Sequence, residues 1–106
     1  MDVSVLVPLF NEAESLPSLH AWIVRVMKEH ALSYEIVFVN DGSNDDSWQV
    51  IQSLREQDEH VKGICFRRNY GKSAALHCGF QMVQGDVVIT MDADLQDSPD
   101  EIPELF

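Results

Sequence analysis

Four short apolar runs alternate along the chain with segments in which apolar residues recur every three to four positions. The apolar runs cover residues 3–8, 35–39, 61–66 and 86–91, and their content of β-branched side chains indicates strands buried on both faces. Helical periodicity is carried first by Leu16, Leu19, Ile23, Val26 and Met27, then by Trp48, Ile51 and Leu54. A third helix is expected over residues 72–83, where small side chains would let it lie close to a sheet, namely Ala74, Ala75, Cys78 and Gly79.

This alternation of strand and helix predicts an α/β fold, a Rossmann-like and mostly parallel sheet with helices on both faces. In such sheets ligands bind outside the carboxyl ends of the strands. Function is therefore expected in the loops that follow them, residues 9–12, 40–46, 67–72 and 92–99. Residues 98–101 resemble the start of a further helix, and the sequence stops soon afterwards. We expect residues 1–106 to be one domain, truncated at its carboxyl-terminal end.

Composition narrows the class of partner. Hydrophobic residues make up 45% of the chain, enough for one core, and seven Lys and Arg against eighteen Asp and Glu give a formal net charge of −11. That charge argues against nucleic acid. We expect no signal peptide, and no apolar stretch in the sequence approaches the ~20 residues that cross a bilayer. We expect a cytoplasmic chain, placed at the cytoplasmic face of the membrane in the full-length protein by residues beyond Phe106.

Cysteine and histidine do not suggest a metal site. Cys65 and Cys78 stand in apolar surroundings without a nearby second thiol, so we expect both to be reduced and buried in the core. The four histidines lack the paired spacing of zinc ligands.

The strongest chemical signal is Asp92-Ala93-Asp94, directly after an apolar run. In extended backbone, residues i and i+2 point to the same side, so both carboxylates could converge on one cation. Gln96 would continue that side as a neutral oxygen donor. Hard oxygen ligands with open coordination positions suit Mg²⁺ or Mn²⁺, with waters and substrate phosphates completing the shell. The alternative is an aspartate pair that caps the next helix.

Two further segments combine turn chemistry with candidate ligand groups. In Asn40-Asp41-Gly42-Ser43, the Asp41 carboxylate could accept hydrogen bonds from the ring N–H groups of a nucleobase. The alternative is a plain turn in which Ser43 or Asn44 caps the following helix.

The second segment, residues 67–73, is the one dense cationic patch in the sequence. Its side chains, Arg68 and Lys72 among them, could hold a diphosphate or an acceptor phosphate, or could be plain surface charge. A P-loop is excluded because Phe66 stands where that motif needs glycine, and no Gly-x-Gly-x-x-Gly points to a dinucleotide.

Taken together, four segments resemble the family 2 glycosyltransferases of the GT-A fold. In order, they are Val7-Pro8-Leu9-Phe10-Asn11-Glu12, Asn40-Asp41-Gly42-Ser43, Arg68-Asn69-Tyr70-Gly71-Lys72 and Asp92-Ala93-Asp94-Leu95-Gln96-Asp97. The resemblance covers essentially the whole chain and is closest to the branch that moves sugars to polyprenyl phosphates, as in dolichol-phosphate mannosyltransferase and bactoprenol glucosyltransferase. It implies that the chain is the nucleotide-sugar-binding half of such an enzyme.

The resemblance also implies roles for individual residues. Three groups would bind the donor: Pro8, Phe10 and Glu12 around the nucleotide, Val39 and Asp41 at the base, and Asp92, Ala93 and Asp94 at the diphosphate and metal. Gln96 resembles an additional metal ligand. Phe10 and Asn40 depart from the Tyr and Asp that are frequent in the family, and they lack the hydroxyl and the charge that those residues carry.

The activity implied is transfer of a sugar from a UDP- or GDP-linked donor to an acceptor, with a polyprenyl phosphate as the favoured acceptor. The cation held by Asp92 and Asp94 would neutralise charge on the departing diphosphate, and an ionised acceptor needs no strong general base. One alternative is a nucleotide-binding fragment without turnover.

The other alternative is an aspartate-nucleophile phosphatase, which Gln96 and the three preceding strands disfavour. An open sheet edge and the face of Ile102, Leu105 and Phe106 further predict self-association.

Overall fold

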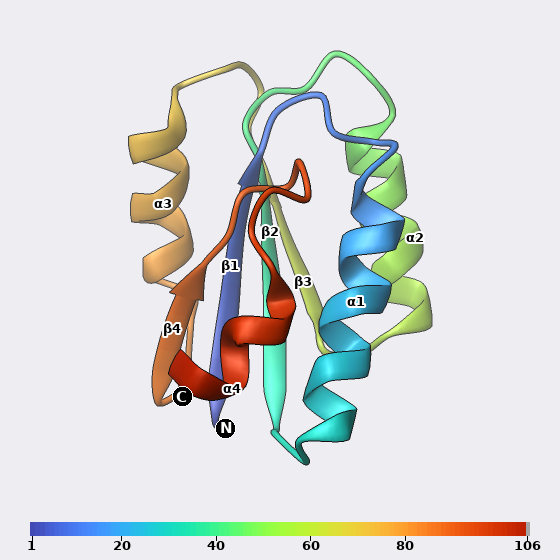
Figure 1. Cartoon of the computed structure of the whole chain (residues 1–106). Coiled ribbons are helices and arrows are strands. Elements are labelled where there is room, and N and C mark those ends of the chain that lie inside the picture. The colour runs from blue at the N-terminus through green and yellow to red at the C-terminus, as the bar shows by residue number, and fades with distance from the viewer. Residues whose placement is uncertain (106) are drawn as a thin grey trace.

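The computed structural model describes residues 1–105. Its elements are β1 (Val3–Leu9), α1 (Leu16–Glu29), β2 (Tyr34–Asn40), α2 (Ser47–Gln57), β3 (Val61–Cys65), α3 (Lys72–Phe80), β4 (Val87–Thr90), the 3-10 turn η1 (Pro99–Glu101) and α4 (Ile102–Leu105) (Figure 1). The predicted order is confirmed, and most boundaries agree within two residues. The third helix is shorter than predicted, because it ends at Phe80 rather than at residue 83.

The four strands form one parallel sheet in the order β3-β2-β1-β4. Helices α1 and α2 cover one face and α3 covers the other (Figure 1). The predicted fold class is therefore confirmed. The register aligns Leu9 of β1 with Asn40 of β2, and Asn40 with Cys65 of β3, so these strands end together. Every loop that follows a strand thus begins at the same edge of the sheet.

Strand β1 supplies side chains to both faces, because its residues alternate in direction. On the α1 and α2 face, Val3, Val5, Val7 and Leu9 join the larger core. On the other face, Leu6 packs with Val37, Val39 and Ala75. A Cβ built on Gly79 of α3 would lie 2.2 Å from Leu6 Cδ1. Glycine is required there for α3 to approach the sheet, which confirms the prediction drawn from small residues.

Both cysteines are free, but the prediction that they are buried is wrong. Cys65 is exposed and Cys78 is half-buried. Cys65 is the last residue of β3, an edge strand whose burial decreases toward its carboxyl end. Because β3 has a neighbouring strand on one side only, the Cys65 side chain lies at the rim of the core.

The alternative in which Ser43 or Asn44 caps α2 is not what the structure shows. The helix begins at Ser47, and Asp45 Oδ1 accepts hydrogen bonds from the Ser47 backbone N–H at 2.9 Å and from its hydroxyl at 2.5 Å. Ser43 and Asn44 are engaged elsewhere, since both bond to Asn11 in the loop after β1.

The carboxyl-terminal segment differs from the expectation of an exposed apolar face. Ile102 is fully buried in the larger core, whereas Leu105 is 60% exposed. The third predicted member of that face, Phe106, lies outside the described residues. In residues 1–105, no helix combines the length and the apolarity needed to cross a membrane.

Candidate functional site

The four loops that follow the strands gather at one edge of the sheet, at the top of Figure 1. This is the arrangement that parallel strands impose, because all their carboxyl ends point the same way. Side-chain hydrogen bonds link the loops to one another, and these links determine where the candidate ligand groups lie.

Asn11 joins the loop after β1 to the loop after β2. Its side-chain Oδ1 accepts hydrogen bonds from the backbone N–H groups of Asn44 at 2.7 Å and Asp45 at 3.3 Å. In return, the Asn11 N–H donates to the Ser43 hydroxyl at 2.9 Å. Asn11 adopts φ of 55°, in the left-handed region that asparagine tolerates better than most residues. The next residue, Glu12, donates its N–H to the Ser47 hydroxyl at 3.0 Å.

Asp41 joins the loop after β2 to the loop after β3. Its two carboxylate oxygens accept from the Tyr70 N–H at 2.8 Å and the Gly71 N–H at 3.0 Å, and its side chain is almost fully buried. The two loops touch at Gly42, where φ is 71° and an added Cβ would lie 2.2 Å from the Arg68 carbonyl carbon. Asp41 therefore stabilises the loop after β3 through these hydrogen bonds. It is also the residue that was predicted to bind a nucleobase.

Lys72 joins the loop after β3 to the loop after β4. Its ammonium nitrogen lies 2.8 Å from Asp92 Oδ1, and both side chains are about half exposed or more. The hydrogen bond with Asp92 and the negative charges of Asp92, Asp97 and Asp94 hold the pKa of Lys72 above its ordinary value. A cationic group thus already occupies the carboxylate that was predicted to bind a metal.

The Asp92-Ala93-Asp94 segment is not extended, so the geometry predicted for it is wrong. Strand β4 ends at Thr90, and residues 93–94 lie in a turn. The turn is closed by the Asp92 N–H donating to Asp97 Oδ2 at 2.9 Å and the Gln96 N–H donating to Asp94 Oδ1 at 3.2 Å. Leu95 has φ of 67°, which reverses the chain. Alternation along a strand therefore cannot place Gln96 beside the two aspartates, and its role as a metal ligand stays a prediction.

Two adjoining pockets lie between these loops. One, of about 380 Å³, is lined by Pro8, Leu9, Phe10, Asp41, Asn69, Gly71 and Lys72. The other, of about 240 Å³, is lined by Pro8, Lys72, Thr90, Met91, Asp92 and Asp97. Pro8 and Lys72 line both, so the two pockets lie next to each other. A larger hollow of about 550 Å³ beside α2 and β3 lies away from every strand-end loop and has an open, polar lining.

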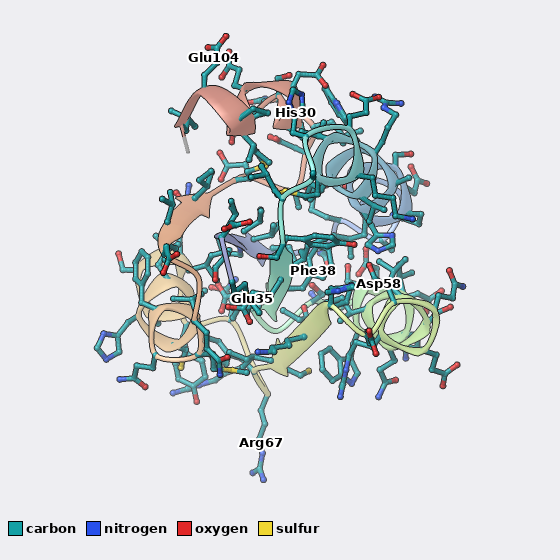
Figure 2. The ribbon with its side chains drawn as sticks, turned by 90° about the horizontal axis from the view of Figure 1, so that it is seen from below. His30, Glu35, Phe38, Asp58, Arg67 and Glu104 are labelled. Carbon is teal, nitrogen blue, oxygen red and sulfur yellow. The ribbon has the colours of Figure 1, made fainter. Side chains whose placement is uncertain are left out.

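Several residues predicted to bind the nucleotide sugar do not present a side chain to these pockets. Val39 and Ala93 are buried in the two cores, so only their backbone atoms could contact a ligand. The Arg68 guanidinium lies over the Tyr70 ring, 4.7 Å from its centroid, and lines neither pocket. Arg67 points away from the body of the molecule (Figure 2). The cationic patch therefore diverges, and of its members Lys72 alone reaches the pockets.

Three polar residues belong to this site but were not predicted as ligand groups from the sequence: Asn69, Asp97 and Asn11. Asn69 and Asp97 line the pockets, and Asn11 links two loops. Each stood inside a motif already singled out, but no spacing rule identifies which member of a loop turns inward. Among residues 1–105, no three or more His, Cys, Asp or Glu side chains are grouped so that they could hold a metal ion.

Comparison with known proteins agrees with this arrangement. The family model described as glycosyl transferase family 2 matches residues 4–106. An undecaprenyl-phosphate 4-deoxy-4-formamido-L-arabinose transferase of Pseudomonas fluorescens is 46% identical over 104 residues, which are 97% of this chain and 30% of that protein. The chain thus spans about a third of the length of this curated relative.

Solved structures share the fold at lower identity. A mannosyltransferase from Pyrobaculum calidifontis in complex with GDP-Man and Mn²⁺ superposes with a TM-score of 0.75 and 24% identity, covering 94% of this chain and 30% of that one. S. aureus TarS in complex with UDP superposes with a TM-score of 0.75 and 19% identity, covering 99% of this chain and 31% of that one. The α/β sheet is thus shared with these two proteins. The match of the family model to residues 4–106 shows that the chain belongs to glycosyl transferase family 2.

Proposed function

We propose that this chain is the donor-binding part of a glycosyltransferase that moves a sugar from a nucleoside diphosphate to a polyprenyl phosphate. The observation that carries the proposal is the pair of adjoining pockets between the linked loops. It brings a proline, an aromatic ring, a buried carboxylate, a lysine and an acidic turn to one sheet edge. The alternative of an aspartate-nucleophile phosphatase is set aside by the family match.

The larger pocket suits the nucleoside. Phe10 is 41% exposed and offers an aromatic surface, and Pro8 forms part of the floor. Asp41 Oδ1 and Oδ2 each accept one backbone N–H, which leaves lone pairs that could accept a base N–H. The same bonds keep the carboxylate fixed before a ligand arrives. UDP in TarS and GDP-Man in the mannosyltransferase support a nucleoside-diphosphate donor without selecting the base.

The smaller pocket suits the diphosphate with a divalent cation. The carboxylates of Asp92 and Asp97 line this pocket, and Asp94 belongs to the same turn, so hard oxygen donors are available there. Mg²⁺ and Mn²⁺ take one or two carboxylates and complete their shells with water and phosphate oxygens, so a site without three preformed protein ligands fits them. When bound, the cation would offset the charge that develops on the departing diphosphate.

Lys72 connects the metal and the phosphates in this proposal. Its ammonium nitrogen lies 2.8 Å from Asp92 Oδ1 and neutralises that carboxylate. A divalent cation that binds Asp92 would displace the ammonium group, which then lies beside the same pocket and can pair with a phosphate oxygen. The exchange is favourable because the pair is exposed and therefore weakly held.

The acceptor is assigned from the relatives rather than from the pockets. The Pseudomonas transferase is named for undecaprenyl phosphate. A phosphate acceptor is ionised near neutral pH, which agrees with a site that offers carboxylates and a lysine but no histidine in its lining. Because the chain spans about a third of that relative, binding of the donor without turnover is the behaviour expected of these residues alone.

Titration calorimetry with UDP and GDP, each with Mn²⁺ and with EDTA, tests the proposal. One nucleotide should bind in a Mn²⁺-dependent manner, and Asp92→Asn or Asp94→Asn should remove most of the dependence. Asp86→Asn is the matched control, because Asp86 is exposed at the opposite end of β4. Failure of both nucleotides to bind, or equal loss in Asp86→Asn, would contradict the assignment.

A further inference from the structure

Ser15 occupies the N-cap position of α1 without capping the helix. A serine in this position ordinarily accepts a hydrogen bond from a backbone N–H in the first turn, which is worth about 1 kcal/mol. Here the residue has helical φ and ψ of −86° and −22°, and its side chain makes no capping bond. The hydroxyl is therefore free for another partner.

That partner is the carbonyl of Ala93, 78 residues away in the sequence. The Ser15 hydroxyl lies 2.6 Å from the Ala93 oxygen, and 3.0 to 3.1 Å from the Glu12 carboxylate and carbonyl oxygens. A hydroxyl has one proton to donate. The Glu12 carbonyl already accepts from the Ser15 and Leu16 N–H groups, so the shortest contact, to Ala93, is the one assigned the proton.

The Ala93 carbonyl depends on this bond. Ala93 is 3% exposed, and within residues 1–105 the structure shows no backbone N–H that donates to its oxygen. Buried carbonyls are satisfied in nearly all native structures. Ser15 is thus the donor that fixes the orientation of the peptide that joins Ala93 to Asp94.

We propose that Ser15 is a positioning residue that aims the Asp92 and Asp94 carboxylates through the Ala93 peptide. The inference rests on the proposed function, since it matters only if these carboxylates bind a cation. The side chain is anchored on α1, and Leu16 and Leu19 of that helix are fully buried. The acidic turn is thereby tied to the rigid helical layer. The bonds to Asp97 and Asp94 lie within the turn itself, and the Lys72 bond to Asp92 comes from an exposed side chain. A ligand set is more precise when its support belongs to a rigid element.

The test is to measure the affinity of the tighter-binding nucleotide, UDP or GDP, in Mn²⁺ and in EDTA for the wild type, Ser15→Ala, Ser15→Thr and Ser18→Ala. Ser15→Ala should reduce the Mn²⁺-dependent gain in affinity by about tenfold, the loss typical of a group that orients metal ligands, and leave binding in EDTA unchanged. Ser15→Thr keeps the hydroxyl and should restore the gain. Ser18 is exposed in the first turn of the same helix and is the control.

The outcomes separate the two proposals. If the wild type gains no affinity from Mn²⁺, the metal part of the proposed function is wrong and Ser15 has no such role. If the wild type gains affinity and Ser15→Ala gains as much, the positioning role alone is overturned. If Ser15→Ala loses nucleotide affinity equally in Mn²⁺ and in EDTA, the positioning role is also overturned. A general loosening of the loops would weaken nucleotide binding under both conditions. A gain lost in Ser15→Ala and restored in Ser15→Thr supports it, and thermal unfolding confirms that each variant is folded.

Discussion

Two lysine–carboxylate pairs with similar geometry lie in opposite environments. Lys62 contacts Glu35 at 2.6 Å, and the Glu35 side chain is 1% exposed. Lys72 contacts Asp92 at 2.8 Å, but the Asp92 side chain is 47% exposed. Glu35 additionally accepts hydrogen bonds from the Ser4 hydroxyl at 2.5 Å and the Gln84 N–H at 2.6 Å. The buried pair is one part of a network, whereas the exposed pair stands nearly alone.

The difference shows that burial, rather than the chemistry of the pair, decides its role. Glu35 lies inside the molecule in the view along the sheet (Figure 2) and joins β1, β2, β3 and the segment before β4. Removing Lys62 would leave the Glu35 carboxylate as a charge that water cannot reach. Asp92 and Lys72 can separate and remain solvated. The first pair is suited to hold strands together and the second to exchange its cation for a ligand.

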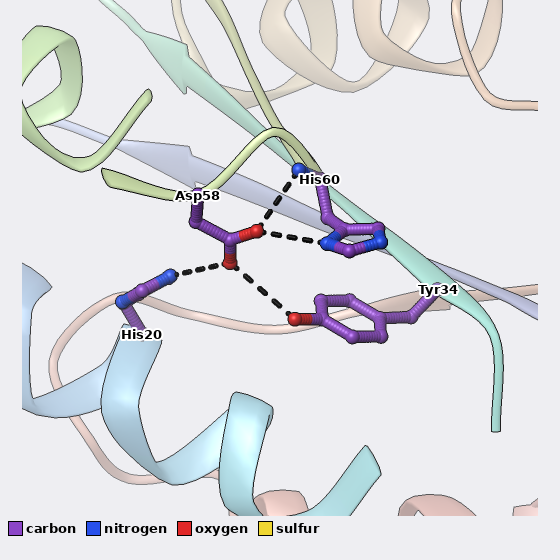
Figure 3. Close-up of polar contacts among 4 residues, drawn as sticks. All are labelled: His20, Tyr34, Asp58 and His60. Atoms are coloured by element: carbon purple, nitrogen blue, oxygen red, sulfur yellow. Dashed lines mark hydrogen bonds and ion pairs between the residues drawn. The ribbon is translucent and has the colours of Figure 1, made fainter. Parts of the chain in front are cut away.

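A third carboxylate, Asp58, lies at the opposite end of the sheet from the strand-end loops and is intermediate in burial. It accepts hydrogen bonds from His20 Nε2 and His60 Nδ1, both at 2.8 Å, and from the His60 N–H at 2.9 Å (Figure 3). The Tyr34 hydroxyl lies 3.4 Å away. Burial and the neighbouring Asp58 raise the pKa of Tyr34 to about 12, so this hydroxyl stays protonated. The cluster ties α1 to the starts of β2 and β3.

Replacing Glu35 should have the largest effect on stability. Glu35→Ala leaves Lys62, Ser4 and the Gln84 N–H without their partner, and we expect a loss of about 3–5 kcal/mol in the free energy of unfolding. Urea unfolding followed by circular dichroism measures it. Glu56→Ala, on the exposed surface of α2, is the control and should change stability by less than about 0.5 kcal/mol. Similar values for the two variants would refute the distinction between the pairs.

Lys62→Met should cost less than Glu35→Ala, about 2–3 kcal/mol, because Ser4 and the Gln84 N–H still stabilise the Glu35 carboxylate. The double variant Glu35→Gln with Lys62→Met should recover part of this loss, since no buried charge remains. A double-mutant cycle measured by urea unfolding gives the coupling between the two side chains. Strictly additive changes would show that the pair is not coupled.

Acid should weaken the chain through Glu35 and Asp58. Burial alone would raise each carboxyl pKa, but hydrogen bonds outweigh it and lower both: those of Lys62, Ser4 and Gln84 for Glu35, and those of His20 and His60 for Asp58. Their contribution is complete above the ordinary carboxyl pKa of about 4 and is lost as the pH falls through the lowered values.

Unfolding in urea from pH 7 to pH 3 measures this dependence. Asp58→Asn should cost about 1–2 kcal/mol at pH 7 and should flatten the acid dependence, because one carboxylate no longer takes up a proton on unfolding. Glu56→Gln should leave the curve unchanged in shape. An acid limb as steep in Asp58→Asn as in the wild type would contradict the role assigned to this cluster.

The smallest change in stability is expected at the exposed pair. Lys72→Met should leave the melting temperature nearly unchanged, since exposed pairs contribute little. It should raise the affinity for Mn²⁺ alone by roughly fivefold, the effect of removing one nearby charge in a high-dielectric environment. Arg67→Met removes the same charge from the same loop, but its side chain points away from the site (Figure 2). Equal gains in Mn²⁺ affinity in the two variants would show that net charge is the cause, and not competition between Lys72 and Mn²⁺ for Asp92.

Local patterns in the sequence predicted the strands, the helices, their alternation and the edge where the motifs meet. They succeeded because hydrophobic periodicity and parallel topology are repeated over many residues, so an error at one position changes little. Asp41 and Lys72 were placed at the site for the same reason, since each follows a strand. The family resemblance was also carried by the sequence alone, through four motifs in a fixed order.

Only the tertiary structure decided how individual side chains are used. The sequence suggested an extended Asp92-Ala93-Asp94 segment, but closure by Asp97 and the left-handed Leu95 make it a turn. Ser15 resembles a helix cap, yet its hydroxyl reaches a carbonyl 78 residues away. Hydrogen bonds of this kind depend on distances between loops that come together only after the sheet has formed, and no local propensity encodes them. The sequence determined which groups reach this edge, and the packed loops determined which of them remain open to a ligand.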